Sequence, residues 1–121
     1  MEAEELRSAL QSTDEIEITV TGRRSGRESS RPVWFVEEGE TLYLLPVSGS
    51  DSNWYKNLLN SPTIRLAADG TELSTNASPI DDPAKVSDVV ERFRGKYGAE
   101  QVRAYYSKLD VAVEIPLASG N

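Results

Sequence analysis

The sequence contains no cysteine and no histidine among its 121 residues. The lack of cysteine excludes disulfides and thiol nucleophiles, and the lack of histidine excludes imidazole-based proton transfer. These two residue types also hold most zinc and transition-metal ions, and the carboxylates of this chain show no calcium-loop spacing, so we expect no metal site. We therefore expect any chemistry to come from a bound cofactor or substrate.

Long apolar runs are also missing, because no stretch approaches the roughly 20 residues that a membrane-spanning helix needs. The N-terminal segment Met1–Leu6 is acidic, whereas a signal peptide begins with basic residues. We expect a cytoplasmic protein with no membrane span, folded as one domain over residues 1–121. The net charge of -7 argues against a nucleic-acid partner, since such proteins present a basic face.

Apolar spacing predicts four helices and six strands. The expected helices are 2–12 near the N-terminus, 54–59, one that opens at Asp82-Pro83 and ends at Gly95 or Gly98, and 100–109. The expected strands are 15–21, 31–36, 41–47, 63–68, 71–80 and 111–117, followed by a tail over 118–121. Because most strands are joined by hairpins, the fold class is mainly β (α+β), a six-stranded antiparallel barrel with peripheral helices.

Four of the nine arginines lie in one glycine-containing turn, at Arg23, Arg24, Arg27 and Arg31. Arginine presents a planar fork of donors that matches phosphate oxygens, and glycine lets the backbone approach an anion closely. The turn therefore indicates an anion site, most simply for a phosphate. A solvated hairpin kept soluble by its charge is the alternative interpretation.

Two further segments are candidates for the same ligand. The loop Ser48-Gly49-Ser50-Asp51-Ser52-Asn53 precedes Trp54, and small residues before a helix expose backbone N–H groups that bind anions. Near the C-terminus, Tyr97, Tyr105 and Tyr106 are able to stack on a planar ring or hydrogen-bond to it. An ordinary helix cap and plain core packing are the respective alternatives.

A second basic cluster, formed by Arg92, Arg94 and Lys96, is typical of a solvated helix face. Its alternative interpretation is a second arm on a polyanionic ligand. Asp51 is a candidate proton-transfer group, although a loop aspartate more often acts as a cap or turn residue.

The order of these segments resembles the deazaflavin-dependent nitroreductase family of the flavin-binding split β-barrel superfamily. The resemblance covers roughly residues 14–117 and rests on Thr21-Gly22-Arg23-Arg24-Ser25-Gly26-Arg27, on Trp54-Tyr55-Lys56-Asn57-Leu58 and on Asn60-Ser61-Pro62. The C-terminal part, Phe93 to Leu117, also resembles a small uncharacterised split-barrel family.

The resemblance implies a cofactor, either the deazaflavin coenzyme F-420 or, as second choice, FMN. It assigns Arg23, Arg24, Ser25 and Arg27 to the phosphate or acidic tail, Ser48, Gly49 and Ser50 to the ring and phosphate, and Trp54 to a supporting position. It also implies hydride transfer to a quinone, nitro compound or similar acceptor, with Tyr97, Tyr105 or Tyr106 as proton donor. Homodimerisation is compatible with it.

Two other functions remain open at this point. One is a cofactor- or small-ligand-binding protein without turnover. The other is a structural dimer module whose basic turn pairs with acidic surface.

Overall fold

The computed structural model describes residues 2–117, with side chains from Glu5 onward. The predicted tail over 118–121 lies outside the described residues. The helices are α1 (Glu2–Leu10), a 3-10 turn η1 (Gly49–Asp51), α2 (Asn53–Asn60), α3 (Pro83–Tyr97) and α4 (Ala99–Tyr105). The strands are β1 (Glu15–Thr21), β2 (Glu28–Glu38), β3 (Thr41–Leu44), β4 (Thr63–Ala68), β5 (Thr71–Asn76), β6 (Ser78–Ile80) and β7 (Ala112–Pro116).

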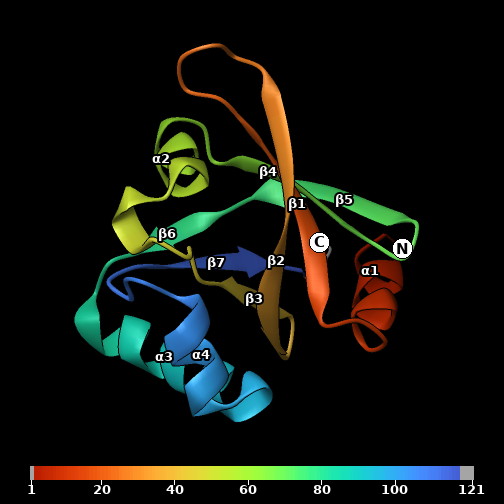
Figure 1. Cartoon of the computed structure of the whole chain (residues 1–121). Coiled ribbons are helices and arrows are strands. Elements are labelled where there is room, and N and C mark those ends of the chain that lie inside the picture. The colour runs from red at the N-terminus through yellow and green to blue at the C-terminus, as the bar shows by residue number, and fades with distance from the viewer. Residues whose placement is uncertain (1, 118–121) are drawn as a thin grey trace.

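The strands form one antiparallel sheet in the order β5-β4-β1-β2-β3-β7-β6. β5 and β6 lie at opposite edges of this order, yet only Ala77 separates them along the chain. Asn76 pairs with Thr63 of β4, and Ser78 pairs with Glu114 of β7. The sheet must therefore curl until its two edges meet at Ala77, which produces the half-barrel seen in Figure 1.

The single strand predicted over 71–80 is in fact two strands, so the sheet has seven strands rather than six. The change of partner at Ala77 explains the difference. Ala77 donates its backbone N–H to the carbonyl of Pro62 and is buried, so the chain passes from one edge to the other without leaving the barrel. The predicted fold class, an antiparallel barrel with peripheral helices, is confirmed.

Residues Asp69-Gly70 form a tight turn, and α3 begins at Asp82-Pro83 and ends at Gly98 as the sequence predicts. Asp69 and Gly70 both have positive φ, at 50° and 81°, as a two-residue hairpin turn of the I′ kind requires. The Asp82 carboxylate accepts a hydrogen bond from the backbone N–H of Lys85, and Pro83 occupies the first turn of α3. Helix α3 ends at Gly98, whose φ is 98°.

The two faces of the curled sheet bury two separate hydrophobic clusters. Val33 and Phe35 of β2 face the barrel interior, while Trp34 and Val36 face outward beneath α3 and α4. The interior is closed by α1 and α2, which contribute Leu6, Leu10, Trp54, Tyr55 and Leu58 among others. The outer cluster is built largely from the apolar stripe of α3, namely Val86, Val89, Val90 and Phe93.

In the described part of the chain, every helix is too short or too polar to cross a membrane.

Candidate functional site

The arginine-rich turn is a six-residue loop, 22–27, at the tip of the β1–β2 hairpin, where Thr21 pairs with Glu28. Gly22 donates its N–H to the carbonyl of Arg27 at 2.7 Å, and Arg27 donates its N–H to Ser25 Oγ at 3.1 Å. Gly26 has a φ of 71°, a conformation that favours glycine. These bonds give the loop a defined shape, and in Figure 1 it projects beyond the sheet beside α2.

Arg23 anchors this loop to helix α2. Its backbone N–H and its Nη1 both donate to Oδ1 of Asn57, at 3.1 and 2.8 Å. Asn57 is buried, so these bonds satisfy an acceptor that water does not reach freely. Arg23 therefore holds the hairpin on α2. The same contact explains the asparagine at position 57 of the Trp54–Leu58 motif.

Arg24, Arg27 and Arg31 are exposed, and none of them forms an ion pair with another side chain in the range 5–117. Nearby, Glu28 is already paired with Arg65 at 3.3 Å. The hairpin thus presents three uncompensated cations on an otherwise acidic protein. Such a concentration of charge attracts anions and is suited to hydrogen-bonding phosphate or carboxylate oxygens.

The Ser48–Asp51 loop, the second predicted anion site, already binds a carboxylate of this chain. Ser50 donates its backbone N–H to Asp110 Oδ1 at 2.9 Å and its hydroxyl to Asp110 Oδ2 at 2.6 Å. Lys108 lies 3.2 Å from Asp51 and 3.7 Å from Asp110. Desolvation acts to raise the pKa of Asp110, but the Ser50 hydrogen bonds and the Lys108 charge outweigh it and lower that pKa below its usual value.

The contact between this loop and Asp110 also requires a glycine at position 49. Its φ is 56°, and a Cβ built on it would overlap the Asp110 carboxylate and approach Lys108. Ser48 donates its N–H to Ser52 Oγ at 2.9 Å, so the side chain of Ser52 serves the loop rather than capping α2. The small residues of this loop are therefore explained by close packing against residues 107–110.

Trp54, predicted to support the cofactor site, is only 3% exposed and belongs to the interior cluster. It lies one turn along α2 from Asn57, and so it fixes the helix on which Arg23 docks. Its position supports the arginine hairpin through packing.

The three predicted tyrosines gather around Trp34 on the outer face of the sheet. Tyr97 stacks on the indole at a centroid distance of 4.3 Å, and Tyr105 packs on it at 4.4 Å. Tyr106 meets the indole edge-on at 6.0 Å, and Phe93 contacts both Tyr97 and Tyr106. Edge and offset contacts of this kind stabilise a packed aromatic cluster.

The hydroxyls of this cluster differ in their partners. Tyr97 Oη accepts the Phe35 N–H at 3.1 Å and lies within hydrogen-bond distance of the Asp14 and Phe35 carbonyls, at 2.8 and 2.9 Å. Burial raises the pKa of Tyr97 to about 12. The Tyr106 hydroxyl is buried without a partner among the described residues, and desolvation raises its pKa as well.

The structure thus brings together some of the predicted residues and separates others. Arg23 lies against α2, where it bonds to Asn53 and Asn57, and Arg24, Ser25 and Arg27 follow it in the same loop with exposed side chains. The tyrosine cluster lies on the opposite face of the sheet, under α3 and α4. Sequence reasoning missed Asn57, Trp34 and Asp110 as partners. Only Asn57 carried a local signal, because it lies three residues after Trp54 in the recognised pattern.

Comparison with solved structures identifies the fold as a split β-barrel. An F-420-H2 dependent reductase superposes with a TM-score of 0.65 at 19% identity, covering 84% of this chain and 93% of that one. The haem storage protein HutZ from Vibrio cholerae gives 0.71 at 14% identity, covering 97% and 90%. A structure described as a domain-swapped dimer gives 0.65 at 19%, covering 93% and 94%. At these identities the likeness shows the fold alone.

Residues 6–114 match the family described as an uncharacterized protein conserved in bacteria, DUF2255, and the chain belongs to this family. No curated protein matches the chain. The expected split-barrel fold is confirmed by the solved structures.

The contact between Gly49 and Asp110 is tested by a matched pair of glycine substitutions. Gly39 also has a positive φ, at 60°, but a Cβ there would meet open space. We expect Gly39→Ala to cost about 1–2 kcal/mol from backbone strain. Gly49→Ala should cost about 1–3 kcal/mol more, because it adds an overlap with Asp110. Urea denaturation measures both, and equal losses would show that Asp110 moves aside freely.

The tyrosine hydroxyls are tested by a second pair. Tyr97→Phe should lower the free energy of unfolding by about 1–3 kcal/mol, since it leaves the Phe35 N–H without its acceptor. Tyr106→Phe should leave that free energy unchanged or raise it by about 1 kcal/mol, because the buried hydroxyl it removes has no partner. Thermal and urea denaturation at neutral pH decide between these outcomes, and a large loss in Tyr106→Phe contradicts the expectation.

Proposed function

We propose that this protein binds a phosphate-bearing planar cofactor, the deazaflavin coenzyme F-420 or else FMN, and acts as a reductase. The observation that carries the proposal is the β1–β2 hairpin, in which Arg24, Arg27 and Arg31 are exposed without carboxylate partners in the described part of the chain. The likeness of the fold to that of an F-420-H2 dependent reductase supports the same assignment.

The residues present fit the anionic part of such a cofactor. Arg23 is held by Asn57, so Arg24 and Arg27 are presented from a loop of fixed shape, and less ordering is needed on binding. The coenzyme F-420 is our first choice, because its acidic tail as well as its phosphate would use several arginines. For Ser48, Gly49 and Ser50 to hold a phosphate, the Asp110 carboxylate would first have to leave them.

When bound, the cofactor would supply hydride transfer to a quinone, nitro compound or similar acceptor. The chain itself would bind and orient the cofactor through the hairpin. Tyr97, Tyr105 and Tyr106 would act as proton donors only for an acceptor bound on the outer face of the sheet, where Tyr105 is the most accessible of the three at 38% exposure. A homodimer is compatible with this proposal.

Cofactor binding is tested with a double variant of the hairpin. Arg24→Ala with Arg27→Ala should weaken binding of the coenzyme at least about tenfold, because charged hydrogen bonds contribute about 1.5–3 kcal/mol each before solvent screening. The control is Lys85→Ala with Arg92→Ala, which removes two positive charges from α3. Thermal-shift titrations with the coenzyme F-420 and FMN side by side measure the effect. Equal weakening by both pairs, or no binding at all, overturns the proposal.

Turnover is tested separately from binding. We expect the protein to oxidise the reduced coenzyme in the presence of a quinone or nitro compound, with a rate that falls in the hairpin variant at subsaturating cofactor. Absorbance of the reduced coenzyme follows the reaction. Binding of the coenzyme without its oxidation by any quinone or nitro compound tested would indicate a non-catalytic binding protein. Dimerisation that depends strongly on salt, with no ligand bound, would instead favour the structural module.

Haem is the ligand of the Vibrio cholerae relative, as its description states. This chain has no histidine and no cysteine, which are the side chains that most often hold haem iron. The chemistry of its donor set therefore favours the phosphate-bearing cofactor.

A further inference from the structure

A second concave region lies between α3, α4 and the segment 106–110, and it is called here the α3–α4 groove. It consists of two adjoining cavities of about 390 and 430 Å³ that share Arg94 and Leu109. Each volume falls in the range of small-molecule sites, about 300–1,000 Å³. Figure 1 places α3 and α4 far from the tip of the arginine hairpin, so the groove is separate from the hairpin, although Asp110 at its edge also bonds to Ser50.

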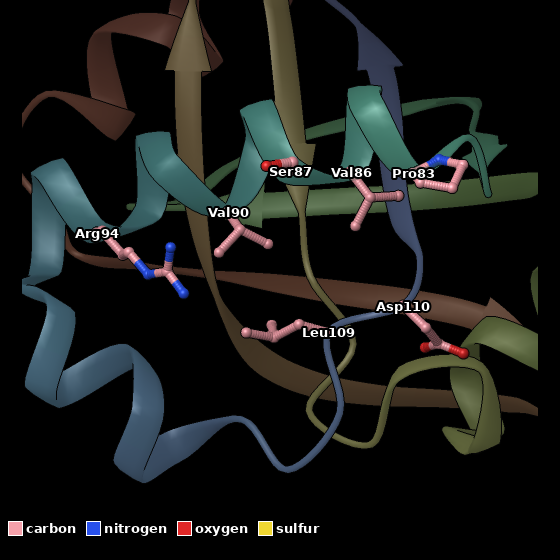
Figure 2. Close-up of a pocket in the computed structure, with 7 residues that line it drawn as sticks. All are labelled: Pro83, Val86, Ser87, Val90, Arg94, Leu109 and Asp110. Carbon is pink, nitrogen blue, oxygen red and sulfur yellow. The ribbon is translucent and has the colours of Figure 1, made fainter.

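One end of the groove has an apolar wall, and Ser87 and the Asp110 carboxylate line it as well. Figure 2 shows Val86, Val90 and Arg94 pointing from successive turns of α3 toward Leu109 on the opposite wall. Pro83 continues this wall toward the start of the helix. A short alkyl chain would bury its surface here, with a gain of about 0.8 kcal/mol for each CH₂ group.

The other end of the groove is cationic. Arg94, Arg103 and Lys108 all line it, although the protein as a whole carries a net charge of -7. Arg94 is paired with Glu91 at 2.8 Å, and Lys108 is paired with Asp51 and Asp110. Arg103 has no carboxylate partner among the side chains of residues 5–117. Arg103 is therefore the cation at this end with its full donor set available to an anion.

Tyr106 also lines the cationic cavity, and its ring packs edge-on against Trp34 and Phe93. Its hydroxyl is buried, so a ligand in the cavity would contact the rest of the residue rather than the hydroxyl.

We propose that the α3–α4 groove binds a small amphipathic carboxylate, with its carboxylate at Arg103 and its alkyl chain between α3 and Leu109. The proposal does not rest on the function of the arginine hairpin. It also gives the second basic cluster of the sequence a partial role, because Arg94 lines both cavities while Arg92 pairs with Glu38 and Lys96 donates to the Phe35 carbonyl.

The probe is sodium octanoate, titrated into the full chain with backbone amide chemical shifts and calorimetry as readouts. Shifts should concentrate in α3, α4 and residues 106–110 and spare the hairpin loop 22–27. Shortening the probe to hexanoate should weaken binding roughly tenfold, as two fewer CH₂ groups are buried. Octylammonium, which has the same chain and the opposite charge, should not bind.

Variants of exposed residues on one helix complete the test. Arg103→Gln should weaken octanoate binding at least about fivefold, since it removes a charged donor. Arg103→Lys should retain most of the binding, and Gln101→Ala, an exposed change on α4 away from the groove, should have no effect. Unchanged binding in Arg103→Gln, binding of octylammonium, or shifts confined to the hairpin would overturn the proposal.

Discussion

The covalent continuity of residues 71–80 is the constraint on which the rest of the structure depends. Ten consecutive residues supply both edge strands of one sheet, so the sheet must curl until the edges meet at Ala77. Curling creates an inside and an outside. The inside is filled by α1 and α2 and the outside is covered by α3 and α4. The surroundings of each candidate residue therefore depend on whether it lies inside or outside the curled sheet.

Features that depend on neighbours in the sequence were predictable. The alternation of Ile16, Ile18 and Val20 defines β1, the pair Asp69-Gly70 defines a hairpin, and Asp82-Pro83 begins α3. Each of these signals acts over a few residues, through side-chain period, positive φ or a cap. The curl of the sheet could not be predicted in the same way. The polar pattern of residues 71–80 is the same whether this segment pairs with one partner strand or with two.

Contacts between residues far apart in the sequence limited how much of the candidate site could be predicted. Ser50 and Asp110 are 60 positions apart, and nothing local marks Asp110 as the carboxylate that the loop holds. Trp54 and Tyr97 likewise had two possible environments, a pocket wall or packed core. In the structure both residues are packed: Trp54 lies in the interior cluster, and Tyr97 stacks on Trp34 at the other face of the sheet. Arg24 and Arg27 of the arginine hairpin stay exposed, because the hairpin extends beyond the rest of the sheet.

The distribution of carboxylates divides the cations of this chain into paired and unpaired ones. Among the described side chains, five of the thirteen Lys and Arg residues pair with a carboxylate, as Arg7 does with Glu37 and Arg65 with Glu28. Even the Ser48–Asp51 loop, suited to an external anion, holds Asp110. A cation that stays unpaired among so many acidic residues keeps its donors available. Arg24 and Arg27 lie on the same hydrogen-bonded loop, so the hairpin favours a ligand with several negative charges. Arg103 borders a groove with an apolar wall, so the groove favours a ligand with a single charge and a hydrocarbon tail.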